Sequence, residues 1–225
     1  MFRVKICGVR LDQDVAAVAA AGADAVGLNF FPPSVRYLDP QSNSTRELSQ
    51  QAHTAGLLRV GVFVNQSAES MLTVADRVGL DAIQLHGDES IETAAVLLQR
   101  GQTVIRAIKL PKLPFDVELM ERRSADWMLL GCHLLLDVDA GAAMGGSGKT
   151  LDWASVRAWA AAYPDVSWTL AGGLKPENVA AAIRATGAIS VDSASGVECP
   201  KGVKNAERIA GFVAATGLCR IDPGR

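Results

Sequence analysis

Several side chains able to do acid–base or nucleophilic chemistry stand at the ends of apolar, strand-like runs of this sequence. Cys7 ends the first run, His86 ends the fourth, and Asp137 follows three leucines in the sixth. A thiol, an imidazole and a carboxyl group can together move protons or attack a substrate if one pocket holds them. Taken singly, each has a plainer explanation, since a cysteine packs as a small hydrophobic residue and a histidine can cap a helix. The chemistry therefore depends on whether the fold gathers them.

A fourth charged group, the guanidinium of Arg36, follows the second run in the rigid segment Pro32–Tyr37. On its own, an arginine in such a loop is also explained by a surface salt bridge. A guanidinium in a pocket, however, matches a planar carboxylate through two parallel hydrogen bonds.

The segments after the last two runs carry glycine and serine where a phosphate could bind. The seventh run ends in Gly172 and Gly173, and the eighth leads into Ser195 and Gly196. Glycine lets the backbone approach phosphate oxygens, and a serine adds a hydroxyl donor. In (β/α)₈ enzymes, phosphate is often held by the loops after strands seven and eight. We therefore predict a phosphorylated substrate.

The Gly-rich segment Gly141–Thr150 resembles a nucleotide phosphate loop only superficially. In the register that fits Lys149 and Thr150, the required first glycine is Ala143. The nucleotide motif therefore fails by one residue. A long Gly-rich loop beside a strand-end carboxylate is better interpreted as a mobile lid.

Apolar runs and Ala-rich helical stretches alternate from one end of the chain to the other, which indicates how these groups are positioned. We expect strands at Val4–Cys7, Asp24–Phe30, Leu58–Val64, Ala82–His86, Thr103–Leu110, His133–Val138, Ser167–Gly172 and Ala188–Ser193. Helical patterns between them include Asp12–Ala21, Ala68–Val78, Glu89–Arg100, Trp153–Ala162 and Pro176–Thr186. Runs that are apolar on both faces are typical of buried parallel strands.

Eight such units predict an α/β fold, a single (β/α)₈ TIM barrel over residues 1–219, followed by a tail at 220–225. The competing open, doubly wound sheet is disfavoured because no G-x-G-x-x-G follows the first strand. In a barrel, the residues at the carboxyl ends of the strands form the active site.

Composition excludes several classes of protein. The net charge is −2, so a nucleic-acid-binding surface is not expected, and no apolar stretch reaches the roughly 20 residues of a membrane span. The N-terminus lacks an apolar signal region. The 4 cysteines are scattered without C-x-x-C pairs, which favours reduced thiols in the cytoplasm and no structural zinc. Composition leaves a monomer or a homodimer open.

Taken together, the motifs resemble the phosphoribosylanthranilate isomerase family of tryptophan biosynthesis. The resemblance runs in order from Val4 to about Asn205. It rests on the segments KICG (5–8), PSVRY (33–37), VGVFV (60–64), QLHG (84–87), LD (136–137), GGSG (145–148), AGGL (171–174) and VDSASGVE (191–198). Small departures are Val35, where the family often has proline, Asn29 in a usually more apolar strand, and Ala194 in place of a frequent serine. These concern the fit of the substrate.

The resemblance implies an Amadori rearrangement of N-(5-phosphoribosyl)anthranilate without a cofactor or metal. It implies that Asp137 is the general acid and Cys7 the general base. For this, burial must raise the pKa of Asp137. Cys7 must become a thiolate, either because its pKa falls from about 8.5 or because its proton leaves when substrate binds, and Lys5 is a candidate to stabilise that thiolate.

The resemblance also assigns binding roles. Arg36 would hold the anthranilate carboxylate. His86 and Asp192 would bind sugar hydroxyls, and Gly172, Gly173, Ser195 and Gly196 would hold the phosphate.

The same fold supports other functions. A phosphosugar epimerase would need a metal cluster, but the chain has only 3 histidines. A relative of indole-glycerol-phosphate synthase would need catalytic lysines and a glutamate at strand ends. A non-enzymatic regulator that binds a phosphometabolite is a further alternative, since fold does not fix function.

Overall fold

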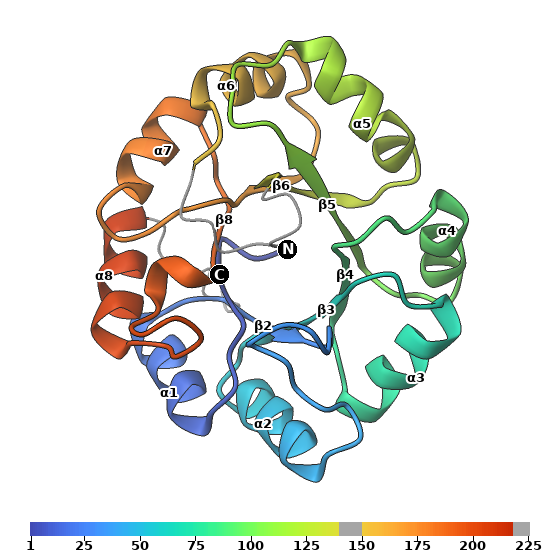
Figure 1. Cartoon of the computed structure of the whole chain (residues 1–225), viewed down its shortest axis with the longest axis vertical. Coiled ribbons are helices and arrows are strands. Elements are labelled where there is room, and N and C mark those ends of the chain that lie inside the picture. The colour runs from blue at the N-terminus through green and yellow to red at the C-terminus, as the bar shows by residue number, and fades with distance from the viewer. Residues whose placement is uncertain (140–149, 218–225) are drawn as a thin grey trace, which may run out of the picture.

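The protein is a closed barrel of eight parallel strands surrounded by helices, as predicted (Figure 1). The structure, a computed structural model, describes residues 1–139 and 150–217. The predicted lid, Gly141–Thr150, lies outside the described residues except for Thr150, and the tail from residue 220 lies wholly outside them. The domain boundaries at 1–219 therefore stay a prediction.

The strands follow one another around the barrel in chain order, and β8 closes it by pairing with β1. Their bounds are β1 Val4–Cys7, β2 Ala25–Asn29, β3 Leu58–Phe63, β4 Ala82–Leu85, β5 Val104–Leu110, β6 His133–Val138, β7 Trp168–Leu170 and β8 Val191–Ser193. All the predicted strands are found. Several are shorter than expected, chiefly β7 and β8, where the predicted run extended into the loops on one or both sides.

The helices form an outer ring, each between two consecutive strands or after the last (Figure 1). They are α1 Asp12–Ala21, α2 Asn43–Thr54, α3 Ala68–Val78, α4 Ile91–Gln99, α5 Val117–Leu129, α6 Trp153–Ala162, α7 Val179–Thr186 and α8 Ala206–Thr216, with a short 3₁₀ helix at Ser195–Val197. Polar residues start most of them. The side chains of Ser67, Ser90 and Asp116, for example, accept hydrogen bonds from backbone amides of the first turn.

The start of α7 differs most from the prediction. Pro176 was expected in the first turn of a helix, but it lies in a separate turn that is closed by bonds from the amides of Asn178 and Val179 to the carbonyl of Lys175. Helix α7 therefore begins only at Val179. The predicted glycine stop at Gly187 is confirmed, with a left-handed φ of 77°.

Two hydrophobic layers hold the barrel together. The larger lies between the strands and the helices and includes the fully buried Trp159 and Phe212. The smaller fills the inside of the barrel with Phe2, Ala25, Val60, Ala82, Ile105, Ala107, Leu135 and Ala171. Half of these are alanines, which leaves space in the barrel for the fully buried side chain of Lys5.

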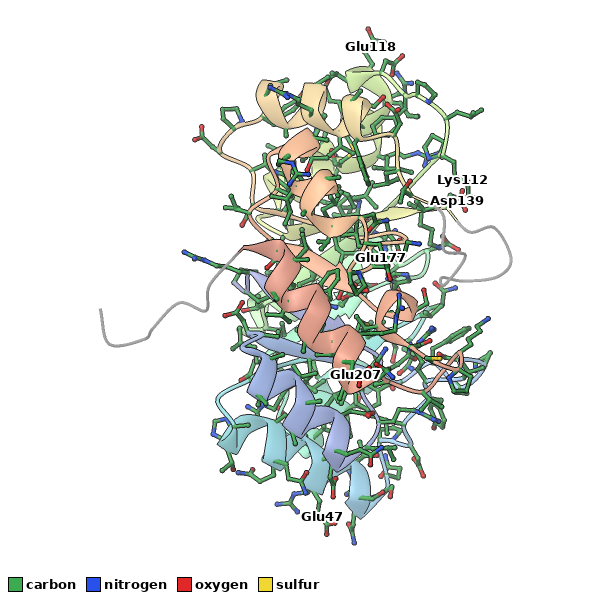
Figure 2. The ribbon with its side chains drawn as sticks, turned by 90° about the vertical axis from the view of Figure 1, so that its left-hand side faces the viewer. Glu47, Lys112, Glu118, Asp139, Glu177 and Glu207 are labelled. Atoms are coloured by element: carbon green, nitrogen blue, oxygen red, sulfur yellow. The ribbon has the colours of Figure 1, made fainter. Side chains whose placement is uncertain are left out.

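The carboxyl ends of the strands meet at one end of the barrel. In the side view, Lys112 and Asp139, which follow β5 and β6, lie close to each other at that end (Figure 2). The amide of Asp139 donates to the carbonyl of Leu110, so the two strands end at the same level. No helix among the described residues is long and apolar enough to cross a membrane.

Candidate active site

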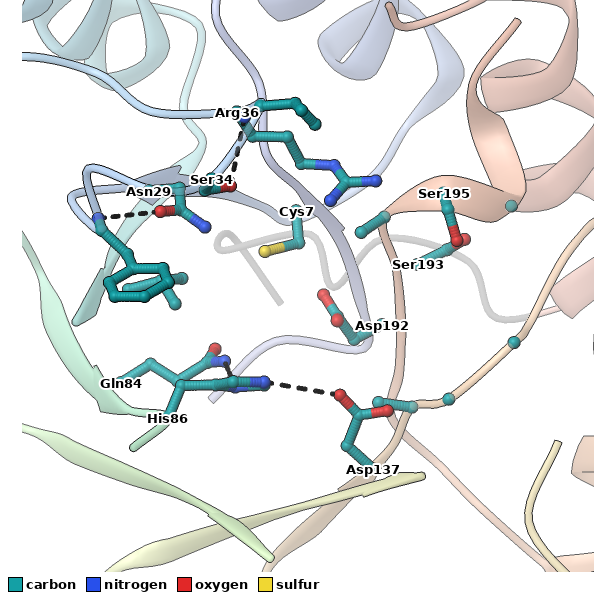
Figure 3. A pocket seen from close by; sticks show the side chains of 18 of the residues that line it. Cys7, Asn29, Ser34, Arg36, Gln84, His86, Asp137, Asp192, Ser193 and Ser195 are labelled. Atoms are coloured by element: carbon teal, nitrogen blue, oxygen red, sulfur yellow. Dashed lines mark hydrogen bonds and ion pairs between the residues drawn. The ribbon is translucent and has the colours of Figure 1, made fainter. Parts of the chain in front are cut away.

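A pocket of about 340 Å³ opens at the carboxyl ends of the strands. Every residue predicted for the site lines it: Cys7, Arg36, His86, Asp137, Gly172, Gly173, Asp192, Ser195 and Gly196. Figure 3 shows Cys7, Asp137 and Asp192 around one space, with Arg36 and Ser195 on one side and His86 on another. The fold thus brings together side chains that are far apart in the sequence.

Strand alternation explains why these residues point inward. Side chains two residues apart share a face of a strand, so Lys5 and Cys7 of β1 both face the inside of the barrel. In the same way Gln84 and His86 both line the pocket. Asp192 lies beside Lys5 in the pairing of β8 with β1.

Cys7 is a buried thiol whose position depends on a glycine of the next strand. A Cβ atom on Gly27 would lie 2.7 Å from the sulfur of Cys7, so only glycine leaves room for the thiol. Burial raises the pKa of Cys7, against the opposing effect of the Lys5 charge. The thiol is therefore protonated at neutral pH before substrate binds, which favours loss of its proton on binding over a pKa lowered by the protein alone.

Lys5 is the nearest source of positive charge. Its side chain is 0% exposed, and its Nζ lies 2.8 Å from Oδ1 of Asp192. Burial alone would lower the pKa of Lys5, but the negative charges of Asp192 and a Cys7 thiolate raise it above its usual value. Lys5 is thus a permanent cation beneath the thiol and the carboxylate.

Asp137 has the properties of an acid near neutral pH. Burial raises its pKa to about 6, although the amide of Val138 donates to Oδ1 at 2.7 Å and partly offsets this. Oδ2 lies 3.6 Å from Nε2 of His86 (Figure 3). The direction of the shift is the one expected from a carboxyl group at an apolar strand end.

Arg36 is buried beside the pocket and is paired within the protein. Its Nε and Nη2 donate to the two oxygens of Glu198, at 2.6 and 2.8 Å. A Cβ atom on Gly8 would lie 2.3 Å from Cδ of Arg36, so Gly8 makes room for the arginine stem. Arg36 lines the pocket, as predicted, and its ion pair is a buried one rather than the surface salt bridge expected of an isolated arginine.

The glycine segments after β7 and β8 pack against each other on the side of the pocket away from His86. A Cβ on Gly196 would lie 1.8 Å from the carbonyl oxygen of Leu174, and the hydroxyl of Ser193 donates to that oxygen at 2.8 Å. Gly172 and Gly173 both have a left-handed φ, at 79° and 66°. Their backbones thereby form one continuous wall that a phosphate can approach.

Several functional candidates were missed from sequence. Gln84 lines the pocket, and strand alternation could have found it, two residues before His86; Asn29 lines it too and was noted only as a departure from the family pattern. Glu198 stands in a family motif, but its contact with the distant Arg36 could not be read from sequence, and Lys204, which pairs with Glu198, gave no signal. Within residues 1–139 and 150–217, no three His, Cys, Asp or Glu side chains gather as a metal site.

Fold and site together define a class: a (β/α)₈ enzyme with a thiol and a high-pKa carboxyl group at the barrel mouth and a glycine wall beside them. A sequence model of the N-(5'phosphoribosyl)anthranilate (PRA) isomerase family matches residues 4–215. The chain belongs to this family. The expected enzyme class, an isomerase of tryptophan biosynthesis, is confirmed.

Individual relatives agree. The N-(5'-phosphoribosyl)anthranilate isomerase of Rhodospirillum rubrum is 40% identical over 217 residues, covering 94% of this chain and 96% of that protein. The crystal structure of phosphoribosyl anthranilate isomerase from Thermotoga maritima has a TM-score of 0.82 at 36% identity, covering 96% of this chain and 99% of that one. A further structure, with TM-score 0.79, 35% identity and the same coverage, is a complex with reduced 1-(o-carboxyphenylamino)-1-deoxyribulose 5-phosphate.

Proposed function

We propose that this pocket converts N-(5-phosphoribosyl)anthranilate to 1-(2-carboxyphenylamino)-1-deoxyribulose 5-phosphate, with Asp137 as general acid and Cys7 as general base. The observation that carries the assignment is the placement of a carboxyl group of pKa about 6 and a buried thiol in one pocket, beside a glycine wall. A related enzyme that binds the reduced product at 35% identity supports a phosphosugar as the ligand.

The first step opens the sugar ring. Asp137 gives its proton to the ring oxygen, the bond from that oxygen to C1 breaks, and the lone pair of the anthranilate nitrogen forms a C1=N double bond. Cys7, as thiolate, then removes the proton from C2. The electrons of the C2–H bond form a C1=C2 double bond, and the electrons of the C1=N double bond return to the nitrogen and neutralise it. The resulting enolamine tautomerises to the ketose.

The protonation states need only one proton between the two groups. Before substrate binds at neutral pH, that proton is on Cys7, because the pKa of the thiol is raised and that of Asp137 is about 6. The active form has the same proton on Asp137. The positive charges of Lys5, Lys204 and Arg36 near the sulfur favour this form by stabilising the thiolate.

The remaining pocket residues bind substrate. Arg36 takes the anthranilate carboxylate, and His86 and Asp192 hold sugar hydroxyls. Gln84 is a further hydroxyl partner, since nothing in the described part of the chain donates to its buried Oε1. Gly172, Gly173, Ser195 and Gly196 hold the phosphate through backbone amides and one hydroxyl.

Other properties extend the proposal. The enzyme uses no cofactor or metal, acts on a small phosphosugar and has no nucleic-acid partner. It works in the cytoplasm, where its thiols stay reduced. It is a monomer or a homodimer, and a related isomerase from Thermotoga maritima is described as dimeric.

The test is turnover of N-(5-phosphoribosyl)anthranilate by the purified protein in the presence of EDTA, followed by the loss of substrate fluorescence. We expect conversion to the ketose, and an Arg36→Lys variant with a raised KM. Binding without conversion would overturn the proposal and favour a regulator. An unchanged KM in Arg36→Lys would remove the proposed carboxylate contact.

A further inference from the structure

Glu198 is a buried carboxylate that does not line the pocket but connects several groups that border it. Oε1 accepts from Nε of Arg36 at 2.6 Å and from Nζ of Lys204 at 2.8 Å. Oε2 accepts from Nη2 of Arg36 and from the amide of Gly202, both at 2.8 Å. Both oxygens of Glu198 are therefore fully used by protein donors.

This carboxylate is charged at any working pH. Its side chain is only 1% exposed, and burial alone would raise its pKa. The hydrogen bonds from Arg36 and the charge of Lys204 reverse that effect and lower the pKa of Glu198 to about 2. A buried charge is costly to hold, so its four donors must be kept together for it to remain ionised.

The contacts fix the guanidinium of Arg36 in direction as well as in place. A two-pronged pair between a guanidinium and a carboxylate sets the plane of the arginine head group. The stem of Arg36 lies against Gly8, and its amide donates to the hydroxyl of Ser34 at 3.1 Å. Arg36 is thus held at three points, and among the residues that the structure describes Glu198 alone binds its charged end.

The link joins two distant loops. Arg36 belongs to the loop after β2, and Glu198 follows the 3₁₀ segment Ser195–Val197 after β8, 162 residues away in sequence. Nζ of Lys204 also donates to the carbonyl of Ala194 at 2.8 Å. The group that faces the anthranilate side of the pocket is therefore anchored to the segment that faces the phosphate side.

The cluster of Arg36, Lys204 and Glu198 has a net positive charge. Arg36 and Lys204 contribute two positive charges against the single negative charge of Glu198. Glu198 therefore restrains Arg36 without cancelling its attraction for an anion.

We propose that Glu198 is a positioning residue of the isomerase: it orients the guanidinium of Arg36 toward the substrate carboxylate and sets the distance of that guanidinium from the glycine wall. This inference rests on the proposed function, in which Arg36 binds the carboxylate. It predicts that loss of the Glu198 charge acts on substrate binding through Arg36, with little effect on the chemical step.

The test compares Glu198→Gln, Arg36→Met and the double variant in steady-state kinetics. Glu198→Gln should raise KM about tenfold, the size expected from weakening hydrogen bonds to a charged group, with kcat changed less than about twofold. In the Arg36→Met background the same substitution should have little further effect on KM, because the group it positions is gone. Binding of reduced 1-(o-carboxyphenylamino)-1-deoxyribulose 5-phosphate, measured by calorimetry, should weaken in parallel.

A matched control lies at the opposite end of the barrel. Asp81 forms the same two-pronged pair with Arg59, at 2.8 Å for both contacts, away from the pocket. Asp81→Asn should leave KM unchanged, which separates loss of an ion pair in general from loss of the one that holds Arg36. Glu198→Asp keeps the charge and should raise KM less than Glu198→Gln does. It replaces Glu198→Gln in the comparison if that variant folds poorly.

The outcomes distinguish the two proposals. If Arg36→Met leaves KM unchanged, the proposed role of Arg36 itself fails. If Arg36→Met raises KM but folded Glu198→Gln or Glu198→Asp does not, the positioning role of Glu198 is wrong. It is equally wrong if the effects of Arg36→Met and Glu198→Gln simply add, or if kcat falls while KM stays constant.

Discussion

Nε2 of His86 lies 3.6 Å from Oδ2 of Asp137, while Nδ1 of the same ring lies 3.0 Å from Nε2, the side-chain amide nitrogen of Gln84. An amide nitrogen only donates, so Nδ1 accepts and the proton of the neutral ring is on Nε2, facing Asp137. Burial, with the charges of Lys5 and Lys109, lowers the pKa of His86 to about 4. The imidazole is therefore neutral at working pH, and Asp137 keeps its raised pKa rather than forming a full ion pair.

The first prediction concerns pH. We expect kcat/KM to fall below about pH 6 and to stay nearly level above it until Cys7 ionises in the alkaline range. Below the pKa of Asp137, Asp137 and Cys7 are both protonated, so the thiolate base is absent. Above the pKa of Cys7, both groups are ionised, so the acid is absent. A pH profile of kcat/KM measures this directly.

The control for this profile is Asp139→Asn, which removes a carboxylate outside the set of residues lining the pocket. It should keep the acid limb of the wild-type profile. A wild-type profile that is flat through pH 6 would contradict the assignment.

The second prediction concerns Lys5. In Lys5→Met the thiol of Cys7 loses the buried cation that lowers its pKa most, so the pH at which it becomes reactive should rise. The rate of alkylation of Cys7 by iodoacetamide, measured against pH by mass spectrometry, reports this without reference to turnover. An identical alkylation profile would show that Lys5 does not act on the thiol.

Two further variants keep the Lys5 experiment interpretable. Lys5→Met leaves Asp192 buried without its 2.8 Å partner, and the double change with Asp192→Asn removes that unpaired charge. Lys109→Met removes a cation on the Asp137 side of the pocket, and the alkylation of Cys7 should not change.

The third prediction concerns acid stability and His133 at the other end of the barrel. This buried ring contacts the hydroxyls of Thr169 at 2.7 Å and Ser167 at 3.1 Å. Burial lowers its pKa from 6.5 to about 4. Between these values the unfolded chain binds a proton that the folded chain does not, so stability rises with pH across the interval and is lost as pH falls from about 6.5.

The measurement is the free energy of unfolding against pH for wild type and His133→Asn. The variant should lose stability less steeply between about pH 4 and pH 6.5. The offset between the proteins near pH 7.5 gives the packing effect alone. Parallel curves would mean that His133 does not contribute.

The fourth prediction compares two glycines. Gly196→Ala would place a methyl group 1.8 Å from the carbonyl oxygen of Leu174, so the glycine wall must shift. We expect a cost of about 1–3 kcal/mol in stability and a raised KM. Gly211→Ala, within α8, meets only ordinary contacts with Pro176 and should stabilise by about 0.5–1 kcal/mol. Thermal midpoints and KM are measured for both variants. An unchanged KM in Gly196→Ala would contradict the proposal that the glycine wall binds the phosphate.

Local patterns were sufficient to predict the fold and most of the pocket. Buried parallel strands have apolar runs that can be recognised singly, and the barrel then brings every strand end to one face. Cys7, His86 and Asp137 could therefore be assigned to one site before any contact was known. The late start of α7 at Val179 was missed because the turn at Pro176 satisfies the same local preferences as a first helical turn.

Long-range contacts could not be predicted in this way. The pairing of Lys5 with Asp192 depends on closure of the barrel between β1 and β8, and that of Arg36 with Glu198 on the packing of two loops. The sequence left two routes to a Cys7 thiolate open: a lowered pKa in the protein alone, or loss of the proton when substrate binds. The pKa of Cys7 is raised, because the loss of hydration in a fully formed core outweighs the nearby cations.

The roles of Cys7 and Asp137 are tested most directly by the turnover of Cys7→Ala and Asp137→Ala, each followed by loss of substrate fluorescence under saturating N-(5-phosphoribosyl)anthranilate. If the thiol is the base and the carboxyl group the acid, each kcat should fall by about 10²–10⁴. Cys132→Ala, which removes a buried thiol outside the pocket, should turn over at the wild-type rate. Near-normal turnover by both Cys7→Ala and Asp137→Ala would contradict the assignment of the two roles.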